Sequence, residues 1–333
     1  MDFIEWAAHF PTERGSWAEF VKDVTIGIIA GHLRCMSMIY KFAKHQVLRR
    51  ALKNVGLVEE IYPTIQNGKI DYAFVGYGRT GTFSVYLALK QLGFKGVHSE
   101  EWGDQPEVLD YFHEHMVKPS IDAGEVIVGD PDMRVIANYG YTAVFDIVPA
   151  IYYEQMLNQF PDCKFILTSR DSESWFESWT SMTQIVSTPL HLAGKLFRLP
   201  ALTKGSDYIR WLFAYLNQDA SILTAPWPTD ITNRETAIPM YEAHNKRVRE
   251  IIPPEKLLEY HPREGWEPLC KFMELDPCPT TPFPHSNSRL SMRVQAWSAF
   301  LLLLEGALVL FFGVSLIRKL FAPKKKQTKA KVL

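Results

Sequence analysis

The sequence contains little cysteine and none of the usual marks of secretion. Its 333 residues include four cysteines, which form neither a C-x-x-C pair nor a zinc-ligand spacing: Cys35, Cys163, Cys270 and Cys278. No N-x-S/T glycosylation acceptor occurs, and the first residues lack the basic and apolar regions of a signal peptide. We therefore expect reduced thiols in a cytosol-type compartment and exclude a disulfide scaffold.

Positive charge is scarce outside the C-terminus. The chain carries 36 Lys and Arg against 37 Asp and Glu, and seven of the basic residues lie within 318–333, where there is no acid. The rest of the chain is therefore net acidic by eight charges, which argues against nucleic acid as a partner. No His, Cys, Asp and Glu residues follow a metal-ligand spacing, so we expect no metal.

One long apolar segment lies near the C-terminus. Val294 to Ile317 is 24 residues long and contains a single charge, Glu305. As a helix it would span ~36 Å, more than the ~30 Å hydrocarbon core of a bilayer. Its apolar side chains favour insertion by about 4 to 8 kcal/mol, against about 2.5 to 3.5 kcal/mol for one central acid. This balance predicts a single transmembrane helix that anchors the protein by its tail.

Strand and helix patterns alternate from Asp71 onward. The expected strands are Tyr72–Gly76, Gly96–His98, Ala143–Phe145, Lys164–Thr168 and Leu257–Tyr260, and the clearest helices are Thr82–Leu92, Pro106–Lys118, Pro149–Phe160 and Trp266–Met273. This order predicts an α/β fold with a P-loop-like, mainly parallel sheet covered by helices on both faces. We expect an N-terminal helical region over 1–69, the α/β domain over 70–287, a linker over 288–293, the transmembrane helix over 294–317 and a basic tail over 318–333.

A glycine-rich turn, residues 76–82, follows the first expected strand and leads into a helix. Its glycines fit the G-x-G-x-x-G fingerprint of dinucleotide sites, and the acidic pair Glu100-Glu101 follows about 20 residues on. The same turn also fits an anion site at a helix N-terminus, formed by Arg79, Thr80, Gly81 and Thr82. A simple strand–helix turn without a ligand is the third interpretation. The Walker pattern with its lysine is absent.

A second anion-binding pair follows the fourth expected strand. Arg170 comes directly after that strand, and Ser178 lies eight residues further on, in a helix. An arginine and a helix hydroxyl suit a second phosphate group. Together with Arg-Thr-Gly-Thr after the first strand, this arrangement resembles the sulfotransferases that use 3'-phosphoadenosine 5'-phosphosulfate (PAPS). It is most similar to the P-loop branch with an Arg-Thr-Gly-Thr loop, often labelled NAD-dependent epimerase/dehydratase-like.

The resemblance covers residues 70–287 and includes three further stretches: Tyr241-x-x-His244-Asn245-x-x-Val248-Arg249, Gly265-Trp266-Glu267-Pro268-Leu269 and Phe283-Pro284-His285-x-Asn287. It implies that Arg79, Thr80, Gly81 and Thr82 hold the 5'-phosphosulfate of PAPS, and that Arg170 and Ser178 hold its 3'-phosphate. Two residues depart from the branch, because Gly78 stands where proline is usual and Phe83 where a second threonine is common. We expect internal hydrogen bonds from His244 and Asn245 and core packing from Trp266.

The resemblance also implies a base that takes a proton from a hydroxyl or amine acceptor near the end of the central strand. Asp146 is the ionisable residue there, and Arg79 would stabilise charge on the leaving group. A purely structural interpretation makes Asp146 the cap of the following helix. The fallback candidates for the base are His98, Glu100 and Glu101.

We therefore expect a PAPS-dependent sulfotransferase with a small-molecule or lipid-like acceptor, held at a membrane by residues 294–317 with its catalytic domain in the cytosol. One alternative is an NAD(P)-dependent oxidoreductase or a nucleotide phosphotransferase. Arg170 with Ser178 argues against a dehydrogenase, and the missing Walker lysine argues against a kinase. The other alternative is a membrane-anchored nucleotide-binding protein that has lost catalysis, which Phe83 would favour.

Deletion of residues 290–333 tests the predicted anchor. The shortened protein should move from the membrane fraction to the soluble fraction at an unchanged melting temperature, and a shortened protein that still sediments would contradict the anchor. The basic tail favours a cytosolic C-terminus, whereas the lack of secretion signals favours a cytosolic catalytic domain. Protease treatment of intact vesicles tests the orientation: digestion of the domain supports the cytosolic placement, and its protection overturns it.

Overall fold

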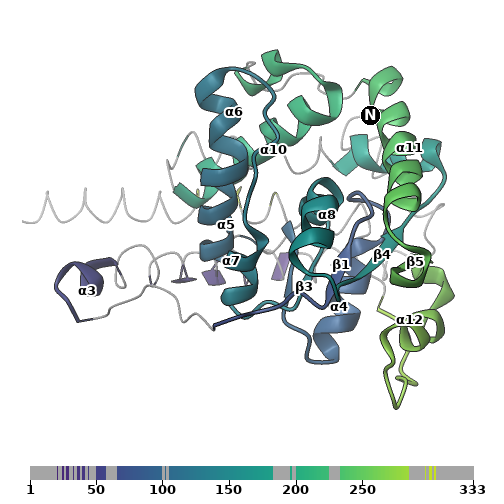
Figure 1. Ribbon diagram of the computed structural model, residues 1–333. Helices are drawn as coiled ribbons and strands as arrows, with labels where there is room; N and C mark the ends of the chain where they lie inside the picture. Colours follow the sequence, from purple (N-terminus) through teal and green to yellow (C-terminus); the bar gives the residue numbers. More distant parts are fainter. Residues whose placement is uncertain are drawn as a thin grey trace, which may run out of the picture.

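Five parallel strands form one sheet at the centre of the protein (Figure 1). The computed structural model describes residues 50–57, 66–99, 102, 105–182, 196, 200–224 and 233–284, with scattered helical positions before residue 50 and after residue 296. The strands are β1 (Tyr72–Phe74), β2 (Gly96–Val97), β3 (Ala143–Val144), β4 (Lys164–Thr168) and β5 (Leu257–Tyr260). Every pairing between them is parallel. The predicted α/β fold with a parallel sheet is therefore confirmed.

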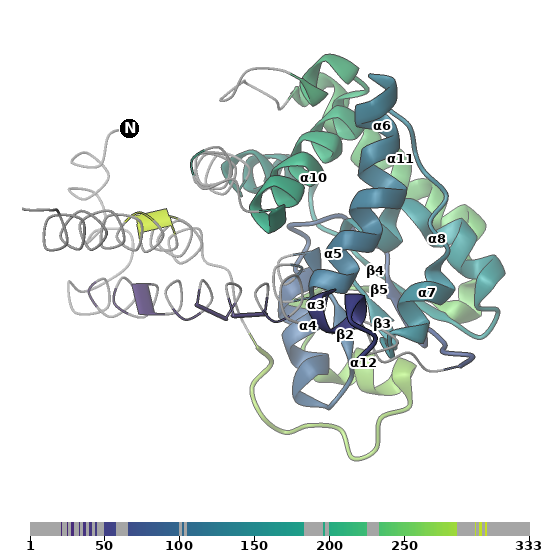
Figure 2. The same cartoon turned by 90° about the vertical axis from the view of Figure 1, so that its left-hand side faces the viewer.

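Helices cover both faces of this sheet (Figures 1 and 2). One face carries α4 (Thr82–Gln91) and α12 (Trp266–Met273). The other carries α5 (Pro106–Phe112), the π-helix η3 (His113–Val117), α6 (Lys118–Ala123), α7 (Met133–Asn138), α8 (Ile147–Gln159), α10 (Pro200–Asn217) and α11 (Arg234–Ile251). Short helices complete the fold: α3 (Arg50–Asn54), η4 (Ala220–Leu223), η5 (Pro254–Lys256) and η6 (Pro262–Glu264).

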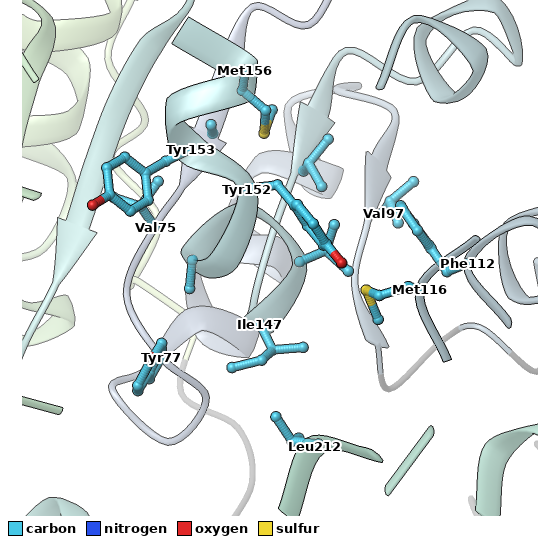
Figure 3. Close-up of a cluster of buried hydrophobic side chains, with 14 of the residues drawn as sticks. Val75, Tyr77, Val97, Phe112, Met116, Ile147, Tyr152, Tyr153, Met156 and Leu212 are labelled. Atoms are coloured by element: carbon cyan, nitrogen blue, oxygen red, sulfur yellow. The ribbon is translucent and has the colours of Figure 1, made fainter. Parts of the chain in front are cut away.

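The two-residue period of β1 divides the core into two hydrophobic clusters. Ala73 and Val75 point into the larger cluster, under α8 and α10, which Figure 3 shows in part. Phe74 points the opposite way and stacks on Phe145 at 4.2 Å between ring centroids, under α4. Because side chains alternate along a strand, β1 is covered by apolar groups on both faces. Polar groups therefore lie at its carboxyl end.

The order of the strands bears on the dinucleotide interpretation of the glycine-rich turn. The order is β2-β3-β1-β4-β5, so β1 lies between β3 and β4. In the dinucleotide-binding fold, the first strand lies between the second and the fourth. The sheet of this protein therefore has a different topology, which disfavours an NAD(P) site at residues 76–81.

Two of the four cysteines are bonded to each other. Cys270, in α12, forms a disulfide with Cys278, because Glu274 adopts a left-handed conformation (φ 59°) that ends α12 and turns the chain back toward the helix. The prediction of reduced thiols is wrong for this pair, whereas Cys163 is free and buried. Cysteine content therefore no longer supports a cytosolic placement of the domain.

The predicted transmembrane helix over residues 294–317 lies almost wholly outside the described residues. Within the part of the chain that the structure describes, no helix combines the length and the apolar character needed to cross a membrane. The anchor thus stays a prediction from sequence. The same holds for most of the N-terminal region over 1–69.

Candidate active site

The turn between β1 and α4 has a backbone suited to binding an anion. Arg79 and Gly81 both have positive φ angles, 75° and 101°, and Gly81 stands at the N-cap of α4 without a side-chain cap hydrogen bond. The first turn of a helix carries N–H groups with no partner inside the helix, and the helix dipole favours negative charge there. The loop that is predicted to bind an anion therefore lies at the carboxyl edge of the sheet, at the amino end of α4.

Internal hydrogen bonds fix the shape of this loop. The Thr80 hydroxyl donates to the Tyr77 carbonyl at 2.7 Å and lies 2.7 Å from the Thr168 hydroxyl, which belongs to β4. The Trp175 indole Nε1 donates to the Gly78 carbonyl at 3.0 Å. Since Thr80 is buried, its side chain shapes the loop; any contribution to binding comes from its backbone.

The second predicted anion site lies beside the first. Arg79 Nε donates to Ser178 Oγ at 3.2 Å, and Arg170 Nη1 donates to the Arg79 carbonyl oxygen at 3.3 Å. Ser178 lies in the helical residues 172–182, which follow β4. The parallel pairing of β1 and β4 thus brings two guanidinium groups and a hydroxyl to the amino end of α4.

Tyr241 of α11 positions Arg170, although the sequence suggested no such role. Its hydroxyl accepts from the Arg170 backbone N–H at 3.0 Å and donates to the Arg170 carbonyl at 3.0 Å. The Tyr241 ring stacks on Trp175 at 4.3 Å between centroids. One aromatic pair therefore holds both the loop after β1 and the arginine after β4. In the sequence, this role is indicated only by the spacing Tyr241-x-x-His244, which puts both side chains on one face of the helix.

Asp146 lies directly after β3, against the same loop. Its φ is 72°, a conformation that is rare and costly for a residue other than glycine. Ser99 donates a hydrogen bond to Asp146 Oδ2. A Cβ on Gly78 would stand only 2.7 Å from Asp146 Oδ1. The absence of a side chain at Gly78 therefore leaves room for Oδ1 beside the anion loop.

Burial makes the Asp146 carboxyl a stronger base than an ordinary aspartate. Loss of hydration raises its pKa from 3.8 to about 6, whereas the hydrogen bond from Ser99, the positive charge of Arg79 and a hydrogen bond from the Ile147 backbone N–H act in the opposite direction. The residue occupies the N-cap position of α8 but makes no side-chain cap hydrogen bond. These features favour the proton-accepting interpretation of Asp146 over the capping interpretation.

The fallback candidates for the base lie elsewhere or outside the described residues. His98 is buried, with Nε2 3.3 Å from the hydroxyl of Thr82. Phe83 packs edge-on against His98 at 5.1 Å between ring centroids, so its ring belongs to the core under α4. Glu100 and Glu101 are not among the described residues.

The expectations for His244 and Trp266 are confirmed, whereas the buried Asn245 Oδ1 has no hydrogen-bond partner among the described residues. His244 Nε2 donates to the Val75 carbonyl at 2.7 Å, and burial lowers the pKa of His244 to about 4, so the ring is neutral. Trp266 Nε1 donates to the Thr281 carbonyl at 2.8 Å, and its ring packs against Phe283. Neither side chain belongs to the polar cluster at the sheet edge.

These residues define an α/β protein with a glycine-rich loop after its first strand and an arginine–serine pair after the neighbouring strand. A family model described as "Sulfotransferase domain" matches residues 74–292, more than half of the chain. The chain belongs to the sulfotransferase family. It is also 28% identical, over 212 residues, to "Ava biosynthesis cluster protein M" of Aspergillus versicolor; the match covers 63% of this chain and 78% of that protein.

Proposed function

We propose that this protein transfers a sulfuryl group from PAPS to a hydroxyl or amine acceptor. The observation that carries the proposal is the contact of Arg79 with Ser178 and of Arg170 with the Arg79 carbonyl at the amino end of α4. This cluster offers several donors to a ligand that bears phosphate groups at two ends. PAPS is such a ligand, and it supplies an activated sulfuryl group.

The two ends of the nucleotide are assigned to the two sides of the cluster. The backbone of the loop around Gly81, with the first turn of α4, would hold the 5'-phosphosulfate, as uncapped helix N-termini hold phosphate elsewhere. Arg170 and Ser178 would hold the 3'-phosphate. Arg79 lies between these sites and would stabilise the charge that grows on the leaving phosphate oxygen.

Asp146 is the proposed general base, and Oδ1 is the atom that takes the proton. Ser99 occupies Oδ2, whereas Oδ1 faces the anion loop across Gly78. A carboxylate with a pKa of about 6 is mostly ionised at neutral pH and still accepts a proton more readily than an exposed aspartate. The replacement of proline by Gly78 then accommodates Asp146 at this position.

The proposals for the acceptor and the cellular location rest on the sequence alone. A lipid-like or small-molecule acceptor agrees with an anchor over residues 294–317. Which side of the membrane carries the domain is tested by the protease experiment described above. The Cys270–Cys278 disulfide removes one argument for the cytosol.

Substitution of Arg170 by alanine tests the division of the nucleotide between the two sides. We expect Arg170→Ala to weaken the binding of 3'-phosphoadenosine 5'-phosphate by about 10- to 100-fold, because a charge-assisted hydrogen bond is lost. Adenosine 5'-phosphosulfate has no 3'-phosphate and should lose much less. Calorimetric titration of both ligands measures the difference.

The matched control for this experiment is Arg247→Ala. Arg247 is exposed, pairs with Glu154 at 2.8 Å and lies apart from the cluster. It should leave both affinities unchanged. Equal losses for the two nucleotides in Arg170→Ala would contradict the assignment of the 3'-phosphate.

Substitution of Asp146 by asparagine tests the base. Turnover should fall by roughly 10²- to 10⁴-fold, whereas affinity for 3'-phosphoadenosine 5'-phosphate should stay nearly constant. In the unchanged protein, turnover should rise with pH through about 6, because the carboxylate must be ionised. Steady-state rates measured from pH ~5 to ~8, a range that brackets this pKa, give both the loss of turnover and its dependence on pH.

Melting temperatures separate this role from helix capping. Because the pKa of Asp146 is raised in the folded protein, its contribution to stability is present at low pH and is lost as the pH rises through about 6. Asp146→Asn should therefore melt at least as high as the unchanged protein at alkaline pH, and the exposed control Asp122→Asn should change neither property. Nearly full turnover in Asp146→Asn, or a lower melting temperature without loss of turnover, would remove Asp146 as the base.

A further inference from the structure

The segment that follows β2 reaches Asp146 through the pairing of β2 with β3. Val97, the last residue of β2, pairs with Val144, the last residue of β3, and the Phe145 backbone N–H donates to the Val97 carbonyl oxygen at 2.9 Å. Ser99 lies two residues beyond β2, and Asp146 lies two residues beyond β3. Because the strands are parallel neighbours, these two residues leave the sheet side by side.

His98, the residue between β2 and Ser99, fixes this segment to the other side of the site. Its side chain is buried, and Nε2 lies 3.3 Å from the Thr82 hydroxyl in the first turn of α4. Its ring also packs against Phe83 and Tyr86, at 5.1 and 5.5 Å between ring centroids. The backbone that carries Ser99 is therefore held by the sheet on one side and by a buried ring on the other.

The hydroxyl of Ser99 determines how the Asp146 carboxyl is turned. It donates a hydrogen bond to Oδ2, while Oδ1 faces Gly78 of the loop after β1, where a Cβ would stand 2.7 Å away. The torsion that turns an aspartate carboxyl has broad minima, so the side chain alone does not select one angle. Since Asp146 is only 9% exposed, water has little access to replace the hydroxyl.

We infer that Ser99 is a positioning residue for the proposed base: its hydroxyl holds the Asp146 carboxyl with Oδ1 toward the loop after β1 and stabilises the ionised form of that carboxyl. The inference rests on the proposed sulfuryl transfer and adds a residue to its machinery. Ser99 itself exchanges no proton in the reaction. The proton of the acceptor moves to Oδ1, while the proton of Ser99 stays on Oγ in its bond to Oδ2.

Two further groups in the described part of the chain act on the charge of Asp146. Burial raises the pKa of Asp146 to about 6, whereas Ser99 and the positive charge of Arg79 both lower it. Tyr208 of α10 is the other titratable neighbour, and burial together with the Asp146 charge keeps the pKa of its phenol well above the usual value, so it stays neutral where Asp146 titrates. Removal of the Ser99 hydroxyl takes away a donor that favours the carboxylate, so the pKa of Asp146 should rise.

Titration of Asp146 in the full chain tests the inference without any substrate. Infrared difference spectra are recorded from pH ~4 to ~9, and the carbonyl band of a protonated carboxyl that Asp146→Asn lacks is assigned to Asp146. The midpoint should lie near 6 in the unchanged protein. In Ser99→Ala it should lie about one pH unit higher, because a hydrogen bond to an ionised group is lost. Ser99→Thr keeps the hydroxyl and should titrate like the unchanged protein.

The matched control is Ser172→Ala. The Ser172 hydroxyl donates to Glu242 Oε1 at 2.6 Å on the exposed surface, so the same kind of bond is removed away from Asp146. The midpoint of Asp146 should not change. Ser99→Cys is a second variant that keeps the size of the side chain and has a weak donor. It should move the midpoint in the same direction as Ser99→Ala, and it provides the measurement if the alanine variant folds poorly.

Turnover separates positioning from a general structural role. With PAPS as donor and 2-naphthol as the acceptor probe, Ser99→Ala should turn over about 10-fold more slowly, at unchanged affinity for 3'-phosphoadenosine 5'-phosphate. The pH of half-maximal turnover should rise together with the infrared midpoint, and the loss that remains at higher pH measures the lost orientation. In the Asp146→Asn background the same substitution should have little further effect, because the two residues act through one group.

The outcomes that overturn the inference differ from those that contradict the proposed function. An unchanged or lowered midpoint in Ser99→Ala would overturn it, and so would an equal shift in Ser172→Ala. Weaker binding of 3'-phosphoadenosine 5'-phosphate at an unchanged pH profile would place Ser99 in the nucleotide site and overturn it as well. Failure of the unchanged protein to bind this nucleotide would contradict the proposed function instead, and the infrared titration would still decide the role of Ser99.

Discussion

The parallel pairing of β1 with β4 determines where the candidate functional groups of this protein lie. Because the two strands run side by side in the same direction, the loop after β1 and Arg170 after β4 leave the sheet at the same edge. The contact of Arg79 with Ser178 and the bond between the Thr80 and Thr168 hydroxyls both follow from this pairing. The positive φ angles at Arg79 and Gly81 then turn the chain into α4, whose amino end faces the same place.

A second constraint, the space left by Gly78, connects the anion loop with the base. The neighbour of β1 on its other side is β3, which delivers Asp146 to the edge of the sheet. Asp146 adopts a strained conformation there and presents Oδ1 to Gly78. A side chain at position 78 would collide with that oxygen, so the glycine and the position of the aspartate are parts of one arrangement. Trp175, which stacks on Tyr241, holds the backbone of Gly78 in place by donating a hydrogen bond to its carbonyl oxygen.

The strands, the glycine-rich turn and the starts of α4, α5 and α12 were predictable because each depends on neighbours in sequence, whereas α8 begins two residues earlier than expected, at Ile147. The five strands show as short, mostly apolar runs, and residues 76–82 and 170–178 carry their chemistry in local spacing. Contacts between distant segments were not predictable in the same way. Tyr241 meets Arg170 across 71 residues, and Lys204 of α10 pairs with Asp110 of α5 across 94 residues. The spacing of eight residues between Cys270 and Cys278 matches no cysteine motif, so their bond depended on the turn after α12.

The central claim is that the cluster at the amino end of α4 recognises a nucleotide with phosphates at two ends, and a thermal-shift comparison tests it most directly. The full chain is heated with 3'-phosphoadenosine 5'-phosphate, NAD, NADP or ATP at equal concentrations. A ligand at 100 times its dissociation constant stabilises the folded state by about 2.7 kcal/mol, a shift of several degrees for a domain of this size. The account predicts that 3'-phosphoadenosine 5'-phosphate gives the largest shift. An equal or larger shift with NAD, NADP or ATP, or no shift with 3'-phosphoadenosine 5'-phosphate, would contradict it.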